Sequence, residues 1–199
     1  MKKAIILSVL YSQVGFFILI PLSIQLITHL HPLVIGIVWF CFSSFITFFV
    51  FLINKERIVI SKQIFHVIIF LYSFGLFILL FFRPENQSYG TVNLIPFETI
   101  YFYLSKQSNF LISIYNIGAN IVLFLPFGLY YRYLKMNSTM RQLLVIAICS
   151  ISTIEAVQFI TRRGSLDIDD LILNTLGVFI GYILSPFIRK VLIIKEATQ

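Results

Sequence analysis

Charged residues are scarce in this chain. Asp, Glu, Lys and Arg make up 12% of its 199 residues, which is about half the share found in soluble globular domains. Hydrophobic residues make up 59%, and 22 residues are Phe. A composition this apolar excludes an ordinary soluble domain and indicates an integral membrane protein.

Cysteines are few, and the common catalytic motifs are missing. Cys41 and Cys149 lie inside apolar runs without CxxC or Cys/His spacing, which argues against a disulfide framework or a zinc site. The sequence contains no GxSxG, no P-loop and no HExxH, so it carries no signature of the corresponding hydrolases or nucleotide-binding proteins. We therefore expect no cofactor and no metal.

Long apolar runs dominate what is present. A spanning helix needs roughly 20 apolar residues, and six runs reach or approach that length: residues 4–27, 33–53, 64–82, 110–131, 143–160 and 171–188. The sequence therefore predicts an all-α, polytopic membrane helical bundle with about six transmembrane helices.

The basic residues divide unequally between the two sides of such a bundle. With the N-terminus inside, eleven of the 15 Lys and Arg residues fall on the cytoplasmic side, and Arg83, Lys106, Arg162 and Arg163 fall outside. Because cytoplasmic loops collect Lys and Arg, we expect a multi-pass protein of the cell membrane with both termini cytoplasmic and the loop 83–109 external. The net charge of +7 then reflects topology and attraction to anionic lipid, not nucleic-acid binding.

The polar residues in the last apolar run lie along one stripe, that is, on one face of the predicted helix. At 100° per residue, Asp170, Asn174, Gly177 and Gly181 fall within about 60° of one another on a helix. Gly177 and Gly181 form a small-xxx-small pair, a pattern on which another helix packs closely. We therefore predict a helix-packing face at the two glycines and a polar site above it.

Two further stripes point to the same end of the helices. Glu155, Gln158 and Arg162 share one stripe, and Asn116 and Asn120 share another. Polar groups beside lipid are costly unless they face protein or water, so we expect these three helices to surround one outward-facing polar pocket.

Each polar feature also has a structural alternative. For Glu155, which we interpret as functional, the alternative is pairing with an arginine or protonation. For Asp167, Asp169 and Asp170 the alternative is helix capping, which we expect to explain one of the three. The asparagines are explained by interhelical hydrogen bonds. The clustered oxygens are also suitable ligands for a divalent cation, although the sequence has no DxDxDG loop.

Four ordered blocks carry a family resemblance. They are Asn93-Leu94-x-Pro96-Phe97, Asn120-x-x-x-Phe124-x-Pro126-Phe127-Gly128, Glu155-x-x-Gln158, and Asp167-Ile168-x-Asp170-Leu171-x-x-Asn174-Thr175-x-Gly177-x-x-x-Gly181. With them the chain resembles the VanZ-like family of membrane proteins, named for a member associated with resistance to the glycopeptide teicoplanin. The resemblance implies an envelope protein affecting glycopeptide susceptibility, and it implies no established reaction.

The resemblance also suggests a division of the chain. Residues 1–63 are interpreted as an N-terminal hairpin and loop, 64–190 as a four-helix VanZ-like domain, and 191–199 as a cytoplasmic tail.

Two functional hypotheses follow. In the first, the pocket binds a membrane lipid or a lipid-linked cell-wall intermediate without catalysis. Its ligand-binding residues are then Asn93, Asn116, Asn120, Glu155, Gln158, Arg163, Asp167, Asp170 and Asn174. In the second, the protein is an enzyme acting on such a headgroup. There, Glu155 serves as general acid or base, Arg163 holds a phosphate, and Asp167 and Asp170 orient the substrate or hold a metal. The lack of an evident nucleophile favours the first hypothesis.

Overall fold

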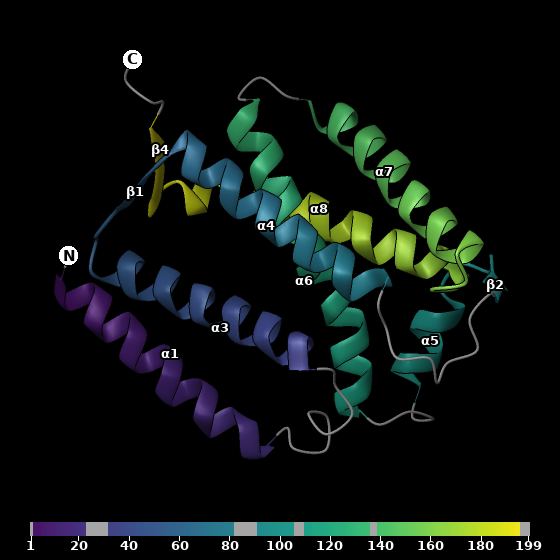
Figure 1. The fold of residues 1–199 in the computed structure, drawn as a ribbon, viewed down its shortest axis with the longest axis horizontal. Coiled ribbons are helices and arrows are strands. Elements are labelled where there is room, and N and C mark those ends of the chain that lie inside the picture. Colours follow the sequence, from purple (N-terminus) through teal and green to yellow (C-terminus); the bar gives the residue numbers. More distant parts are fainter. Residues whose placement is uncertain (1, 23–31, 82–90, 106–109, 136–138, 196–199) are drawn as a thin grey trace. The chain divides into compact units, whose positions relative to one another are not determined.

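The computed structural model describes residues 2–22, 32–81, 91–105, 110–135 and 139–195 (Figure 1). Within these ranges the helices are α1 (Lys2–Leu22), α3 (Pro32–Ile53), α4 (Lys62–Phe81), α5 (Glu98–Leu104), α6 (Phe110–Leu134), α7 (Met140–Ile160) and α8 (Ile168–Ile188). The six long helices coincide with the six apolar runs, and the short α5 was not predicted. Much of the loop 83–109, namely residues 83–90 and 106–109, lies outside the described residues, as does the end of the expected tail, 196–199.

The long helices have the length and apolar character of membrane spans. Five of them, α1, α4, α6, α7 and α8, are long and apolar enough to cross a membrane, and Val38–Ile53 of α3 forms a shorter apolar helix. The predicted all-α membrane fold is therefore confirmed.

The chain divides into two compact units. Unit 1 comprises Met1–Ile68 and Pro186–Gln199, and unit 2 comprises Ile69–Ser185. This division follows spatial contacts, whereas the sequence interpretation placed its boundaries after residues 63 and 190.

In unit 1, α1 packs against α3 through a stripe of small residues. Ala4, Ser8 and Ser12 are only 2–3% exposed, and they recur every four residues on one face of α1. A Cβ atom built at Gly15 would lie 3.1 Å from the ring of Phe42. Small side chains on α1 thus make room for aromatic side chains of α3.

A parallel ladder joins the two sequence segments of unit 1. β1 (Ile58–Ser61) pairs with β4 (Leu192–Lys195), with Ile58 opposite Leu192 and Ser61 opposite Lys195. The ladder adjoins an apolar cluster of Ala4, Val50, Phe51 and Val191, on which Ile58 packs. The segment before α4 and the segment after α8 are therefore held together.

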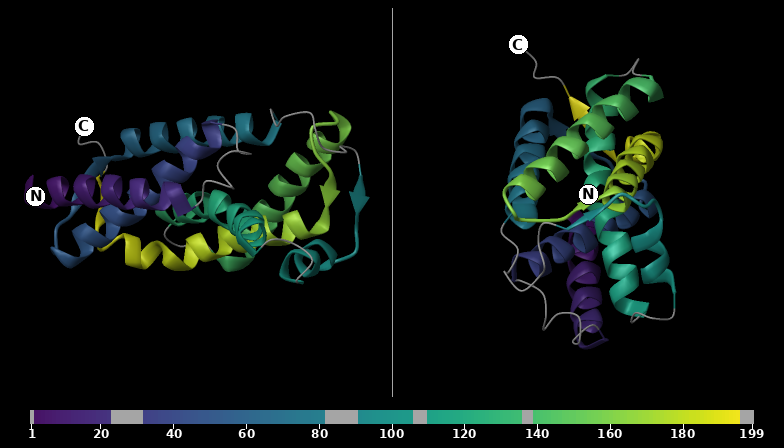
Figure 2. Two further views of the ribbon diagram at one scale, coloured as in Figure 1. Left: turned by 90° about the horizontal axis from the view of Figure 1, so that it is seen from below. Right: turned by 90° about the vertical axis from the view of Figure 1, so that its right-hand side faces the viewer.

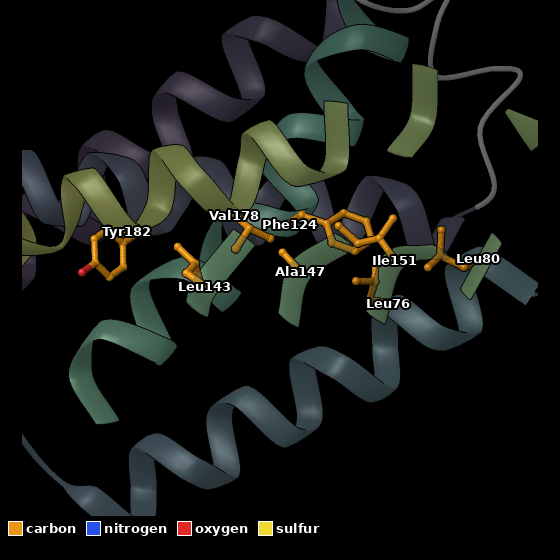
Figure 3. Packing of buried hydrophobic residues seen from close by; sticks show 8 residues of the cluster. All are labelled: Leu76, Leu80, Phe124, Leu143, Ala147, Ile151, Val178 and Tyr182. Atoms are coloured by element: carbon orange, nitrogen blue, oxygen red, sulfur yellow. The ribbon is translucent and has the colours of Figure 1, made fainter. Parts of the chain in front are cut away.

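Unit 2 contains the larger apolar core. Figure 3 shows its buried residues, which come from α4, α6, α7 and α8: Leu76, Leu80, Phe124, Leu143, Ala147, Ile151, Val178 and Tyr182. The four helices thus share one core.

Thr139 caps the start of α7 by accepting a hydrogen bond from the amide of Gln142 at 3.3 Å.

Within unit 2, α6 and α8 approach at the level of their backbones. Cβ atoms built at Gly177 and Gly181 would overlap the carbonyl oxygens of Ile121 and Leu125, and one built at Gly128 would overlap the carbonyl oxygen of Val178. Carbonyls lying over glycine Cα atoms are typical of Cα–H···O contacts between helices. Both glycines of the predicted packing face lie in this contact.

An arginine of α6 forms a hydrogen bond with a backbone carbonyl near the end of α8. Pro186 has no N–H, so the carbonyl of Tyr182 loses its helical donor. Arg132 Nη1 of α6 donates to that carbonyl at 3.1 Å, and its guanidinium lies 4.5 Å from the centre of the Tyr182 ring. Arg132 thus satisfies a backbone group that the proline leaves without a partner, which fixes α6 against α8.

Candidate functional site

The turn between α7 and α8 is closed by backbone hydrogen bonds. Arg162 lies in the left-handed region, with φ of 53°. Its amide donates to the carbonyl of Phe159, and the amide of Arg163 donates to that of Gln158 at 2.8 Å. This is a Schellman motif, with Arg162 at the position that glycine usually occupies. The motif directs the chain back from α7 into α8.

Gln158 is the buried anchor of this turn. It is 4% exposed, its Nε2 donates to the carbonyl of Leu80 at 3.0 Å, and a Cβ atom at Gly164 would lie 3.1 Å from its Cβ. Its side chain therefore links α7 to the end of α4.

A second parallel ladder joins this turn to the segment before α5. β2 (Val92–Asn93) pairs with β3 (Leu166–Asp167), and the amide of Leu166 also donates to the carbonyl of Thr91 at 3.0 Å. The two strands lie side by side in Figure 2. The ladder thus brings Asn93 next to Asp167, two residues that are far apart in the sequence.

Asp167 caps α8 and closes a short chain of hydrogen bonds. Its Oδ1 accepts from the amide of Asp169 at 2.9 Å, which is the geometry of a helix N-cap. Its Oδ2 accepts from Thr99 Oγ1 at 2.7 Å, and Asn93 Nδ2 donates to the same Thr99 oxygen at 3.0 Å. Asn93 Oδ1 also accepts from the amide of Ile95 at 3.1 Å. Asn93 and Asp167 are therefore engaged in holding the segment together.

Asp169 caps a different helix. It is 0% exposed, and its oxygens accept from the amides of Phe97 at 2.6 Å and Ile100 at 3.0 Å. These are free donors at the start of α5. Asp169 is not among the predicted site residues, yet it is the most buried acid in the described part of the chain. Asp167 and Asp169 therefore both cap helices, whereas capping was expected for one of the three aspartates.

Asp170 serves a third purpose. It lies half-buried in the first turn of α8, and its Oδ1 accepts from Asn120 Nδ2 of α6 at 2.5 Å. One helical turn further along α8, Asn174 is 4% exposed, and its Oδ1 has no hydrogen-bond partner among the described residues. The predicted stripes on α6 and α8 therefore meet at Asn120 and Asp170, beside a buried acceptor.

The remaining predicted residues lie on α6, α7 and the turn. Glu155 is 6% exposed on α7, Asn116 is half-buried on α6, and Arg163 is exposed. We define the polar site as Asn116, Asn120, Glu155, Arg163, Asp170 and Asn174. Convergence of all six on one pocket stays a prediction. Across the described ranges, no group of three or more His, Cys, Asp and Glu residues is arranged to hold a metal ion.

Comparison with known proteins adds one match. The family model described as VanZ/LLP1 matches residues 33–189. The match begins within α3, ahead of residue 64, where the sequence interpretation started the VanZ-like domain. Neither a curated protein nor a solved structure matches the chain.

Proposed function

The chain belongs to the VanZ/LLP1 family, and we propose that it is a cell-envelope protein whose polar site binds the headgroup of a membrane lipid or of a lipid-linked cell-wall intermediate. The observation that carries this proposal is the amide oxygen of Asn174. It is buried without a partner among the described residues, and a buried unsatisfied polar group calls for an explanation. A hydroxyl donor from a headgroup supplies one.

The neighbouring charges suit the same kind of ligand. Asp170, which accepts a hydrogen bond from Asn120, lies one turn along α8 from Asn174, and carboxylate and amide groups are of the kind that bind hydroxyl-rich headgroups. Arg163 is exposed on the adjoining turn, and its guanidinium pairs well with a phosphate. A ligand that carries both hydroxyl groups and a phosphate therefore matches this set of side chains.

Lipid retention by the purified protein tests the proposal. We expect mass spectrometry of the parent to detect a bound lipid with a hydroxyl-bearing headgroup, and we expect Asn174→Leu and Asp170→Asn to lose most of it. Ser185→Ala is the matched control. Ser185 is 0% exposed on the same helix, and its Oγ also lacks a partner among the described residues. Equal lipid in all variants would contradict the proposal.

An effect on glycopeptides belongs to the same proposal. A protein that sequesters or masks an envelope lipid changes how a lipoglycopeptide such as teicoplanin reaches the cell surface. Expression in a susceptible host should raise the inhibitory concentration of teicoplanin, and Glu155→Gln should abolish the change at equal membrane abundance. An unchanged inhibitory concentration with the parent protein would refute this part.

The second candidate is an enzyme that acts on the same headgroup. The burial of Glu155 favours it, because a buried carboxyl is a common general acid or base. Against it, both carboxylate oxygens of Asp167 already accept hydrogen bonds within the chain. Turnover of the co-purified lipid by the parent, lost in Glu155→Gln, would establish the enzyme.

We also propose that both termini are cytoplasmic and that the polar site faces outward. Labelling a cysteine placed at Thr91, in a chain lacking Cys41 and Cys149, tests this orientation. Thr91 is exposed, so intact cells should be labelled. Labelling only after permeabilisation would reverse the assignment.

A further inference from the structure

The ladder in unit 1 carries basic residues at both ends. Arg57 directly precedes β1 and Lys190 lies just before β4, while Lys62 follows β1 and Lys195 ends β4. Adjacent strands lie about 4.8 Å apart, and the amide of Ile58 donates to the carbonyl of Val191 at 2.7 Å. Basic residues from two distant segments are thus placed side by side at each end of the ladder.

The two faces of the ladder differ. Successive side chains on a strand point to opposite faces, so Ile58, Ile60 and their partners share one face. That face meets the apolar cluster, because Ile58 packs there. The other face carries Val59 and Ser61 on β1, with Ile193 and Lys195 opposite them, and Arg57 directly precedes β1. It therefore presents a basic residue at each end and apolar Val59, which is 50% exposed, between them.

The surroundings are also basic and apolar. The described segments 54–62 and 186–195 contain one acidic residue, Glu56, and six basic residues: Lys55, Arg57, Lys62, Arg189, Lys190 and Lys195. Exposed apolar side chains lie next to them in the sequence, with Ile53 76% and Phe187 57% exposed. Because α3 ends at Ile53 and α4 begins at Lys62, the ladder directly adjoins the ends of membrane-spanning helices and so lies at headgroup level.

We propose that this ladder binds anionic phospholipids, with a phosphate at each basic end and the acyl chains along the adjoining apolar residues. Lys and Arg near an anionic lipid surface each attract it appreciably, whereas the zwitterionic headgroup of phosphatidylcholine offers no net negative charge. The proposal is independent of the polar site, which lies in unit 2 and consists of three asparagines, two acids and one arginine.

Competitive lipid binding to the full chain tests this proposal. Native mass spectrometry in mixed micelles compares retained phosphatidylglycerol with retained phosphatidylcholine. We expect the parent to prefer phosphatidylglycerol and Arg57→Gln/Lys195→Gln to lose about thirtyfold of that preference, since each charge contributes on the order of 1 kcal/mol. Lys135→Gln/Arg141→Gln removes the same charge from exposed positions in unit 2 and should keep the preference.

Each other outcome overturns the proposal. An equal loss in both double variants would show a net-charge effect only, and equal retention of the two lipids by the parent would show no headgroup selection. Displacement of the lipid by excess inorganic phosphate would identify a free-phosphate site instead. If Arg57→Gln/Lys195→Gln does not fold, Lys195→Gln alone, at an exposed strand end, should lose about fivefold of the preference. An unchanged preference in that variant also overturns the proposal.

Discussion

The contact between α1 and α3 and the contact between α6 and α8 have the same sequence signature but different chemistry. Both use small residues spaced by three or four positions. On α1, Gly15 faces the flexible ring of Phe42, whereas on α8, Gly177 and Gly181 face backbone carbonyls of α6. A ring can rotate or shift, but a helical carbonyl cannot move without its helix. The spacing therefore predicts close approach, and the opposing atoms decide how much change the contact tolerates.

The ladders of the two units also differ in the kind of contact that surrounds them. β1 and β4 adjoin an apolar cluster, while the β2–β3 ladder is surrounded by directed hydrogen bonds to Asp167 and Asp169. Apolar contacts tolerate changes of shape better than directed hydrogen bonds do. We therefore expect unit 2, which also contains all four family blocks, to be the less tolerant unit.

The largest expected effect is that of Gly181→Leu. The new side chain would overlap the carbonyl oxygen of Leu125, so α6 and α8 must separate, at a cost of about 3 kcal/mol. Thermal unfolding in detergent measures the loss. Gly118→Leu on α6 is the matched control, because a Cβ atom there meets nothing within 4 Å. If the two variants unfold together, the α6–α8 contact is not the determinant.

Asp169→Ala should have the next largest effect, and a local one. It removes the acceptor of the Phe97 and Ile100 amides, and hydrogen bonds to charged groups contribute about 2 kcal/mol. Hydrogen exchange at these two amides should therefore become faster by about tenfold or more. Asp170→Ala, at the neighbouring position, should leave their exchange near the parent rate. Unchanged exchange in Asp169→Ala would show that α5 is held by other contacts.

The sequence predicted the elements that have a periodic residue pattern, and it missed the elements that are too short to have one. Six apolar runs identified the six long helices, and helical periodicity placed Gly177 and Gly181 on one face, where the structure has the α6 carbonyls. A seven-residue helix and strands of two or four residues are too short to show a period. No local pattern could reveal that Asp169 caps a helix beginning about 70 residues earlier, because its partners are backbone amides of α5.

The polar site illustrates the same limit. Stripe geometry put Asp170 and Asn174 on one face and Asn116 and Asn120 on another, and the Asn120–Asp170 hydrogen bond joins these faces. The stripe geometry could not separate helix capping from ligand binding for Asp167, because both roles require an Asp side chain at the start of a helix.

Gly15→Ala should have a small effect, in contrast with Gly128→Ala. Alanine gains about 1 kcal/mol of helix propensity over glycine, which offsets a contact of 3.1 Å with the Phe42 ring. The same gain cannot offset overlap with the Val178 carbonyl at Gly128. Thermal unfolding should show Gly15→Ala within about 1 kcal/mol of the parent and Gly128→Ala well below it. Equal losses would remove the distinction between the two contacts.

The smallest effect should be the same in both units, because it concerns local backbone strain. Lys55 and Arg162 both lie in the left-handed region, with φ of 54° and 53°, and both end a helix in a Schellman motif. A non-glycine residue there costs about 1 kcal/mol, partly offset by the extra freedom that glycine has in the unfolded chain. Lys55→Gly and Arg162→Gly should therefore each raise stability by about 0.5 kcal/mol, measured by thermal unfolding in detergent. Lys55→Ala and Arg162→Ala, which remove the same charges but keep the strain, should give no gain. A gain in only one unit would show that packing around the turn, and not the backbone conformation, sets the effect.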